Sequence, residues 1–276
     1  MMIAKSGPFV VTVEFDNDPL DPREQYDNFG HMICWHRRYN LGDNHGYDSP
    51  EEFLSELVHD NTGNAERKKI IADVKRGEYE GMKLEYNRSS REWELNVYSN
   101  FLKKWFTEYT FAAPLDNELD LVFDAVVENM SMDALVSVAE DLVVILPLYL
   151  YDHSGITMNT TGFSCRWDSG QVGWIYATKY EIRKEYGKLT EDTIDAARRL
   201  LVAEVSEYDS YISGQCYGFR LYEDGKEIDS CWGFLGDFRE VIQWMKQYMP
   251  EGHEDMLDNL EELEYGESIE DYLEVS

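Results

Sequence analysis

Two short stretches of the sequence hold residue types that could perform acid–base, covalent or metal chemistry. The first stretch contains His31, Cys34, His36 and His45. A zinc site needs four ligands at regular spacing, and His31-x-x-Cys34-x-His36 supplies three without a matching second pair. The pattern favours a strand over residues 32–39 whose Arg37 and Arg38 pair with nearby acids, and we expect no bound metal and no other cofactor.

The second stretch is Tyr151-Asp152-His153-Ser154-Gly155, which contains the three residue types of a hydrolase triad. Triad members converge from separate segments, and no Gly-x-Ser-x-Gly elbow is present to expose a nucleophile. A turn that leaves a buried strand uses the same residues for hydrogen bonding. An enzymatic alternative stays open, in which a hydrolase-type composite site draws on these candidates: His31, His36, Asp152, His153 and Cys165.

A third pattern is a row of carboxylates at every fourth position. Its members are Asp116, Asp120, Asp124 and Glu128. On a helix this spacing places them on one face at steps of about 6 Å, a coarse imitation of the phosphates of DNA, which repeat about every 3.4 Å along one strand. The alternative interpretation is that this carboxylate row is an ordinary solvated face of a helix.

Acidic residues also dominate the end of the sequence, where Glu251 to Ser276 contains no Lys or Arg. Candidate partner-binding residues there are Glu254, Asp258, Glu261 and Glu262. Met256, Leu260 and Leu263 give this stretch a helical stripe, which predicts a short docked acidic helix followed by a frayed tail.

The whole chain is strongly acidic: 55 Asp and Glu against 25 Lys and Arg give a net charge of −30 over 276 residues. Such a surplus repels nucleic acid and anionic membranes, so basic protein surfaces and cations are the expected partners. Hydrophobic residues make up 43% of the sequence and aromatic residues 14%, which indicates a folded protein and not a disordered one.

The elements that must position these residues alternate between helical and strand patterns, which predicts an α+β fold with a mixed, largely antiparallel sheet covered by helices. Residues 1–59 and 142–250 are expected to form the core, residues 60–141 an insertion or second lobe, and residues 251–276 the acidic helix and tail. Within the insertion, Arg67 to Arg91 is the only basic-rich stretch, whereas no Lys or Arg lies between Lys104 and Arg166.

Local signals define several elements. Ser49 and Pro50 begin a helix, residues 117–129 and 132–140 form two more, and Thr190 begins a long one. Residues 142–151 read as a buried strand, and Asp224-Gly225 predicts a hairpin between strands 215–222 and 228–234. We expect the segments 31–43, 152–178 and 215–234 to share one sheet that shields Trp167, Trp174 and Trp232.

Export and membrane signals are weak. The four cysteines are scattered without a disulfide framework, and the longest apolar run, Leu142 to Tyr151, is about half a membrane span. The expected location is therefore the cytoplasm, with homo-oligomerisation open.

Three segments together resemble an uncharacterised protein family found in bacteriophages and mobile elements. They are residues 148–179, which contain YDHSGITMNTTGFSCRWDSGQVGWIYAT, residues 30–43, GHMICWHRRYNLGD, and residues 229–234, DSCWGF. The resemblance covers most of the chain outside residues 60–142 and the tail, and it brings no established activity. It implies a context in which small acidic phage proteins often inhibit host defence.

Charge and context together predict an inhibitor of a host DNA-acting defence protein, such as a restriction, CRISPR or other anti-phage nuclease. It would bind the basic DNA-binding surface of that host protein, in the host cytoplasm, without binding nucleic acid itself. The two alternatives are the hydrolase described above and an acidic binding module without mimicry.

Overall fold

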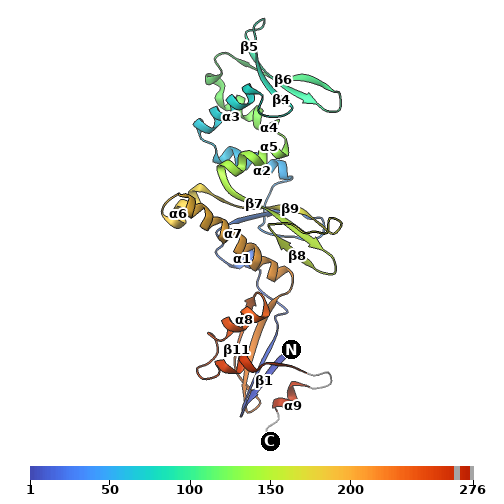
Figure 1. Cartoon of the computed structure of the whole chain (residues 1–276), viewed down its shortest axis with the longest axis vertical. Helices are drawn as coiled ribbons and strands as arrows, with labels where there is room; N and C mark the ends of the chain where they lie inside the picture. Colours follow the sequence, from blue (N-terminus) through green and yellow to red (C-terminus); the bar gives the residue numbers. More distant parts are fainter. Residues whose placement is uncertain (264–267, 274–276) are drawn as a thin grey trace.

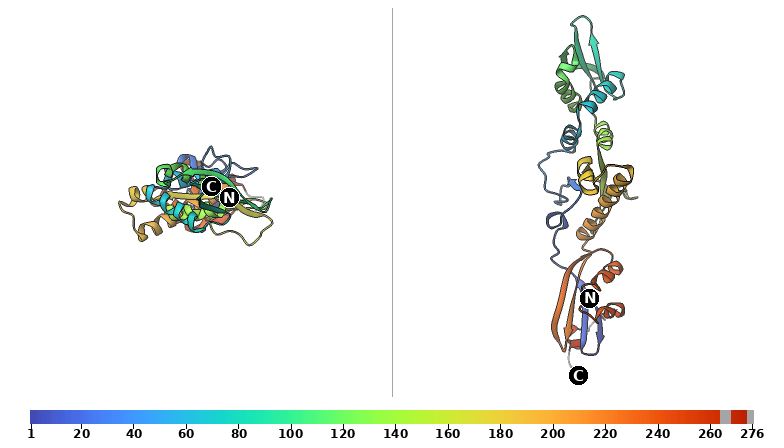
Figure 2. Two further views of the ribbon diagram at one scale, coloured as in Figure 1. Left: turned by 90° about the horizontal axis from the view of Figure 1, so that it is seen from above. Right: turned by 90° about the vertical axis from the view of Figure 1, so that its left-hand side faces the viewer.

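The computed structural model describes residues 1–263 and 268–273. The chain folds into three lobes that follow one another along a single long axis (Figures 1 and 2). Its accessible surface is 16590 Å², whereas a compact monomer of this mass would expose about 12,300 Å². The excess of roughly a third reflects the rod-like arrangement.

The terminal lobe comprises residues 1–16, 215–263 and 268–273, so both ends of the sequence contribute to it (Figure 1). Its antiparallel sheet has the order β11-β10-β2-β1-β12. The strands are β1 (Met2–Ser6), β2 (Phe9–Phe15), β10 (Cys216–Glu223), β11 (Lys226–Leu235) and β12 (Glu261–Glu262). Helix α8 (Phe238–Met245) and η2 (Glu254–Asn259) pack on one face, and α9 (Ile269–Leu273) packs on the other.

The central lobe comprises residues 17–49 and 143–214 and contains an antiparallel sheet of order β3-β9-β7-β8. The strands are β3 (His31–Cys34), β7 (Val143–Asp152), β8 (Ile156–Asn159) and β9 (Ser169–Thr178). Three helices accompany them: α1 (Pro22–Gln25), α6 (Lys179–Tyr186) and α7 (Glu191–Ile212). The long helix α7 covers one face of the sheet, and its buried Ala197, Leu201 and Val205 meet Ile175 of β9 there.

The distal lobe comprises residues 50–142 and carries the third antiparallel sheet, of order β4-β5-β6. Its strands are β4 (Met82–Asn87), β5 (Glu92–Ser99) and β6 (Lys104–Ala112). Its helical elements are α2 (Pro50–Asn61), α3 (Asn64–Arg76), η1 (Leu115–Glu118), α4 (Leu119–Glu128) and α5 (Met132–Leu142). One apolar core joins this lobe to the central sheet, because Phe53 of α2 and Leu142 of α5 belong to the same cluster as Trp174 of β9.

Several local predictions are confirmed, beginning with the α+β class. Helix α2 begins after Ser49, whose hydroxyl accepts a hydrogen bond from the Glu52 N–H at 3.2 Å, and Pro50 occupies the first turn. Thr190 likewise caps α7. The β10–β11 hairpin turns at Asp224-Gly225, where both residues adopt positive φ.

The prediction of one shared sheet for residues 31–43, 152–178 and 215–234 is wrong. The first two segments pair as β3 and β9, but the third forms β10 and β11 in the separate sheet of the terminal lobe. Trp174 is shielded at 8% exposure, whereas Trp167 is 95% exposed on the β8–β9 connection and Trp232 is half-buried. Apolar content showed that each segment packs, but not against which partner.

Three element boundaries also differ from expectation. The predicted strand over residues 32–39 ends at Cys34, since Gly42 returns to bridge Ile33 and the chain must turn between them. The insertion was predicted to begin at residue 60, but this position lies within α2. The whole of α2 belongs to the distal lobe, where it packs against α5 and α4. The predicted acidic helix after Glu251 forms η2 and then β12, which pairs with β1; the predicted frayed tail falls partly on residues 264–267 and 274–276, outside the described residues.

Candidate functional site

The predicted carboxylate row lies on the outer face of α4 and the preceding turn. Asp116 belongs to η1, and Asp120, Asp124 and Glu128 belong to α4. Helix α4 buries an apolar face that includes Phe123. The aspartates of the row remain 57 to 77% exposed because they project from the opposite face.

Neighbouring side chains partly neutralise this row. Arg67 of α3 forms an ion pair with Asp120 at 2.7 Å, and Lys68 lies 3.8 Å from Asp116. His59 of α2 lies 3.7 Å from Asp124. Tyr109 donates a hydrogen bond to Glu128 at 2.5 Å. The start of the basic stretch therefore faces the acidic row, and two of the row's four carboxylates lie beside a Lys or Arg.

The acidic residues of the terminal lobe have fewer cations beside them. The lobe's described residues include sixteen Asp and Glu but only five Lys and Arg, a ratio above three, whereas residues 50–142 have a ratio of two. Asp258 pairs with Lys246 at 2.5 Å, and Glu254 accepts a hydrogen bond from the Gly252 N–H at 2.8 Å. Glu261 and Glu262 are exposed on the edge strand β12, and neither has an ion pair within the described part of the chain.

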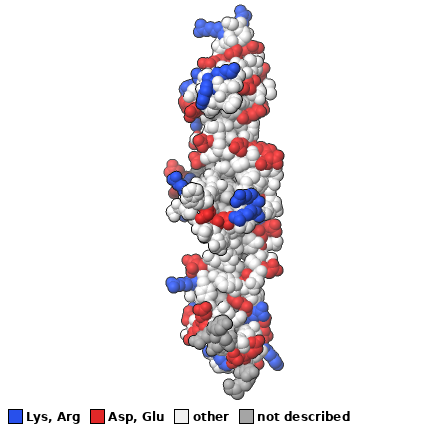
Figure 3. Space-filling model, turned by 90° about the vertical axis from the view of Figure 1, so that its right-hand side faces the viewer, with Lys and Arg blue, Asp and Glu red and all other residues white. Residues whose placement is uncertain are grey.

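The face of the molecule drawn in Figure 3 carries Asp and Glu along its whole length, from the distal to the terminal lobe. Lys and Arg form separate small groups between them. An elongated body with spaced carboxylates is thus a feature of the whole molecule and not of one helix.

A pocket of about 540 Å³ opens in the central lobe where β3 ends. His36, Asp152, Asp168, Arg37 and Trp167 are among its lining residues. Arg38 forms an ion pair with Asp152 across the pocket. Two of the predicted candidates, His36 and Asp152, therefore come together here.

The His36 ring is held by backbone hydrogen bonds and by stacking. Its Nδ1 accepts hydrogen bonds from the Arg38 and Tyr39 N–H groups at 3.4 and 3.3 Å, and its ring stacks on Tyr39. Burial, followed by the charges of Arg38 and Arg37, lowers the pKa of His36 below its ordinary value. His36 can donate from Nε2, but its Nδ1 is already engaged.

His153 and Cys165 meet at one carboxylate instead of meeting each other. The His153 Nδ1 lies 3.4 Å from Asp168 Oδ2, and the Cys165 Sγ lies 3.6 Å from the same oxygen. A covalent mechanism needs the base within hydrogen-bond reach of the nucleophile. Within residues 1–263 and 268–273 no hydrogen bond joins Cys165 to His153, so the arrangement lacks that contact.

His31 lies away from this pocket, at the other end of β3. Its Nε2 is 2.6 Å from Glu181 Oε1 at the start of α6, and its ring lies 5.0 Å from that of Tyr176. The hydrogen bond to Glu181 raises the pKa of His31. Burial opposes ionisation of Glu181, but hydrogen bonds from His31 and Thr178 outweigh it and lower the Glu181 pKa to about 2.

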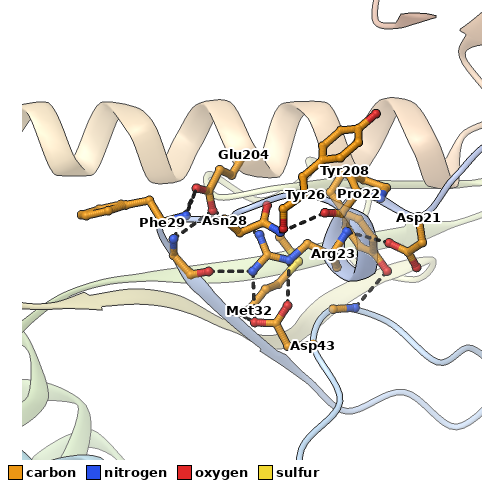
Figure 4. A network of polar contacts seen from close by, with 12 residues as sticks. Asp21, Pro22, Arg23, Tyr26, Asn28, Phe29, Met32, Asp43, Glu204 and Tyr208 are labelled. Carbon is orange, nitrogen blue, oxygen red and sulfur yellow. Dashed lines mark hydrogen bonds and ion pairs between the residues drawn. The ribbon is translucent and has the colours of Figure 1, made fainter. Parts of the chain in front are cut away.

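A buried ion-pair network in the central lobe was not predicted from the sequence. Arg23 of α1, whose side chain is 2% exposed, donates to both carboxylate oxygens of Asp43 at 2.8 and 3.0 Å and to Glu204 of α7 at 3.1 Å (Figure 4). Its Nη2 also donates to the Gly30 carbonyl at 2.6 Å. Burial opposes the charge of Arg23, but these hydrogen bonds and charges raise its pKa above the ordinary value.

This network joins α1, β3 and α7 at one point. Glu204 also accepts hydrogen bonds from the Phe29 and Gly30 N–H groups, and Asp43 accepts one from the Met32 N–H at 2.8 Å. The one available signal was that Arg23 is the only Lys or Arg between Lys5 and Arg37. Its role is to position the chain, since each of the three nitrogens of its guanidinium group donates to a protein acceptor.

Metal-binding groups, disulfides and membrane-spanning helices are each absent from the described residues. No group of three or more His, Cys, Asp or Glu side chains there is arranged to hold a metal ion. All four cysteines are free thiols. No helix in this part of the chain has the length and apolar character needed to cross a bilayer.

Comparison with known proteins adds no assignment. No protein-family model matches the chain, and neither a curated protein nor a solved structure is significantly similar to it. Function must therefore be argued from the geometry and the charge.

Proposed function

We propose that this chain inhibits a host DNA-acting defence protein by covering its basic DNA-binding surface, and that the terminal lobe makes the principal contact. The observation that carries the proposal is the charge of that lobe, with sixteen acidic and five basic side chains at one end of an elongated body. A basic cleft that accepts duplex DNA would attract such a surface from a distance.

The ion pairs support the terminal lobe over the row on α4 as the principal contact. In the row from Asp116 to Glu128, Asp120 pairs with Arg67 and Asp116 with Lys68. In the terminal lobe, Asp258 has a cation partner, whereas Glu261 and Glu262 have none in the described chain. We therefore assign the row on α4 a secondary part in binding.

The pocket in the central lobe gives less support to the hydrolase alternative. His36 and Asp152 lie together there, but Asp152 is engaged by Arg38 and His36 by two backbone N–H groups. Cys165 and His153 contact Asp168 and not each other. A poised nucleophile–base pair, the feature that would favour catalysis, is not formed by these residues.

The first experiment asks which defence protein is inhibited. Bacterial strains that each carry one defence nuclease (a restriction enzyme, a CRISPR nuclease or another anti-phage nuclease) are infected with and without expression of the chain. The proposal expects restored plaque formation in at least one strain. The inhibited nuclease is then purified, and its binding to labelled duplex DNA is measured against increasing amounts of the chain.

Mimicry predicts competition with DNA that weakens as salt is raised from about 50 to 200 mM. An inhibitor that forms a ternary complex with nuclease and DNA would contradict the proposal. So would inhibition that is insensitive to salt.

A further inference from the structure

The terminal sheet has an open edge. Strand β11 is the outermost strand of the order β11-β10-β2-β1-β12, and no strand pairs with its free side anywhere in the described chain. Its first residues, Lys226 to Ile228, are exposed. An unpaired edge of this kind presents backbone N–H and C=O groups that another strand can bind.

Two pockets, each with exposed aromatic or aliphatic side chains in a partly polar lining, lie beside this edge. One, of about 340 Å³, is lined by Leu20, Tyr26 and Cys216 together with Trp232. The other, of about 290 Å³, is lined by Trp244 of α8, Tyr248 of the turn that follows α8, and Phe234. Both pockets share Trp232, Gly233 and Leu235 of β11. Leu20, Trp244 and Tyr248 are 63, 49 and 61% exposed, so apolar surface is available at both pockets.

The pockets lie on opposite faces of the sheet. Phe234 belongs to the core beneath α8, which places the second pocket on that face. The Trp232 ring lies over Gly218 and Arg220 of β10 on the other face; a Cβ on Gly218 would be 2.2 Å from this ring. Gly233 adopts a φ of 87° and has open space around it, so no side chain separates the two pockets along the edge.

Successive side chains of a β-strand point to opposite faces of its sheet. The register of β11 against β10 shifts between Cys231 and Phe234, beside both pockets. A regular strand added along the free side of β11 would place one apolar side chain in each pocket from two neighbouring positions. Main-chain hydrogen bonds to the edge would supply affinity, and the two pockets would supply selectivity.

The surroundings of the edge are acidic. Asp16 and Asp18 line the first pocket and Glu207 lines the second. Strand β11 itself carries Lys226, Asp229 and Glu227, the last of which pairs with Arg220 at 3.6 Å. A second copy of this chain is disfavoured as the occupant, because each copy carries a net charge of −30 and would set its own Glu227 and Asp229 against these acids. A segment with basic residues on either side of an apolar pair complements the site.

We propose that the free edge of β11 binds an extended, basic segment of the partner protein as an added antiparallel or parallel strand, with two adjacent apolar side chains in the pockets flanking Trp232. This inference rests on the proposed function for the basic character of the partner. Attraction between charges does not fix the position of a partner segment on the lobe. Strand addition at β11 would fix that position.

The test uses the full chain and a short capped peptide in which Thr-Val-Leu-Thr is flanked by Lys and Arg at both ends. Backbone amide hydrogen exchange is measured with and without the peptide. The proposal expects slowed exchange within Lys226–Leu235, where the edge becomes paired. Two peptide controls are used: one with alternate backbone amides N-methylated, and one with Glu in place of Lys and Arg.

The matched protein variants are Trp244→Ala combined with Tyr248→Ala, which opens the second pocket, and Tyr180→Ala, which removes a side chain of 72% exposure on α6. The double variant should bind the peptide at least about tenfold more weakly, because buried aromatic anchors dominate such contacts. Tyr180→Ala should bind as the parent does. Circular dichroism of each variant checks that it is folded.

Equal binding of the N-methylated peptide would overturn strand addition, and equal binding of the Glu peptide would overturn the basic partner. Protection that appears only outside β11, or a double variant with parental affinity, would overturn the site. These outcomes are separable from the proposed function. A chain that protects β11 with the peptide but fails to compete with DNA for a nuclease would refute the inhibitor proposal alone.

Discussion

At the scale of single residues, Arg23 joins three elements of the central lobe through one buried guanidinium group. Its guanidinium is 2% exposed and holds Asp43 and Glu204, which are themselves 25 and 10% exposed. Removing one member of a buried ion-pair network leaves the other charges without compensation, which typically costs about 3 to 5 kcal/mol.

Arg23→Ala should therefore lower the free energy of unfolding by about 3 to 5 kcal/mol, measured by urea denaturation. The matched control is Arg198→Ala, which removes an exposed helical pair with Asp195 and should cost no more than about 1 kcal/mol. Equal losses in the two variants would show that the network does not hold α1, β3 and α7 together.

The pair of His31 and Glu181 makes a second residue-scale prediction, on pH. The raised pKa of His31 means that its contribution to stability is complete below its ordinary value of 6.5 and is lost as pH rises through the raised pKa. The lowered pKa of Glu181, about 2, means that its contribution is present above its ordinary 4.5 and is lost as pH falls toward 2. The pair therefore stabilises the fold most between these limits.

The His31→Gln variant should have a lower free energy of unfolding than the parent at about pH 6. The difference between the two proteins should shrink as pH rises above the His31 pKa. The effect is small, since the His31 side chain is 46% exposed and solvent screens the pair. Thermal unfolding of both proteins across this pH range measures it. A deficit that stays constant with pH would contradict a charged His31.

At the scale of elements, neutralising the two acidic regions should change the affinity for the nuclease by different amounts. Replacing Asp116, Asp120, Asp124 and Glu128 by Asn or Gln removes charges that Arg67 and Lys68 already partly offset. Replacing Glu254, Asp258, Glu261 and Glu262 removes the same number of carboxylates from the terminal lobe, where fewer cations lie nearby.

The terminal-lobe variant should therefore lose more affinity for the inhibited nuclease than the α4 variant, by about tenfold or more. Both variants should remain folded, because the replaced side chains lie on the surface and exposed ion pairs contribute little. Titration of the nuclease with each variant, checked by circular dichroism, provides the comparison. A larger loss in the α4 variant would return the principal contact to that helix.

Elements defined by neighbouring residues were predictable from the sequence. The cap at Ser49, the cap at Thr190 and the Asp224-Gly225 turn each depend on a few adjacent residues, and each forms as expected. The Arg23 network was not predictable, because its partners Asp43 and Glu204 lie 20 and 181 positions away. Pairing of β2 with β10 joins equally distant segments, and no local pattern marks it.

In the candidate site, too, features set by neighbouring residues were predictable and contacts between distant segments were not. The sequence located the carboxylates of the row and their helical spacing, and the structure places three of them on α4. What the sequence could not show is that the basic residues Arg67 and Lys68 of α3 fold against that row. The sequence also suggested one composite site for His31 and His36, but the two residues lie at opposite ends of strand β3.

At the scale of the whole molecule, shape and charge act together. Three lobes in line give an accessible surface of 16590 Å², about a third more than a compact monomer of this mass. An extended acidic body can follow a long basic groove, which a sphere of equal charge would touch only at one point. Small-angle X-ray scattering should accordingly show a rod-like particle.

A maximum dimension expected of a compact globule of 32.3 kDa would contradict that arrangement. The measurement is best made at several salt concentrations, because self-repulsion in a chain of net charge −30 favours extension at low salt. A rod that persists at high salt would show that packing between the lobes, and not repulsion alone, sets the shape.

The central claim is that this acidic surface and DNA occupy the same site on a nuclease. Its most direct test is displacement of labelled duplex DNA from the inhibited nuclease by the chain, followed by fluorescence anisotropy at rising salt. The account predicts full displacement at low salt, a progressive loss of affinity as salt rises, and a weaker effect for the terminal-lobe variant. DNA that remains bound while the chain is also bound would contradict it.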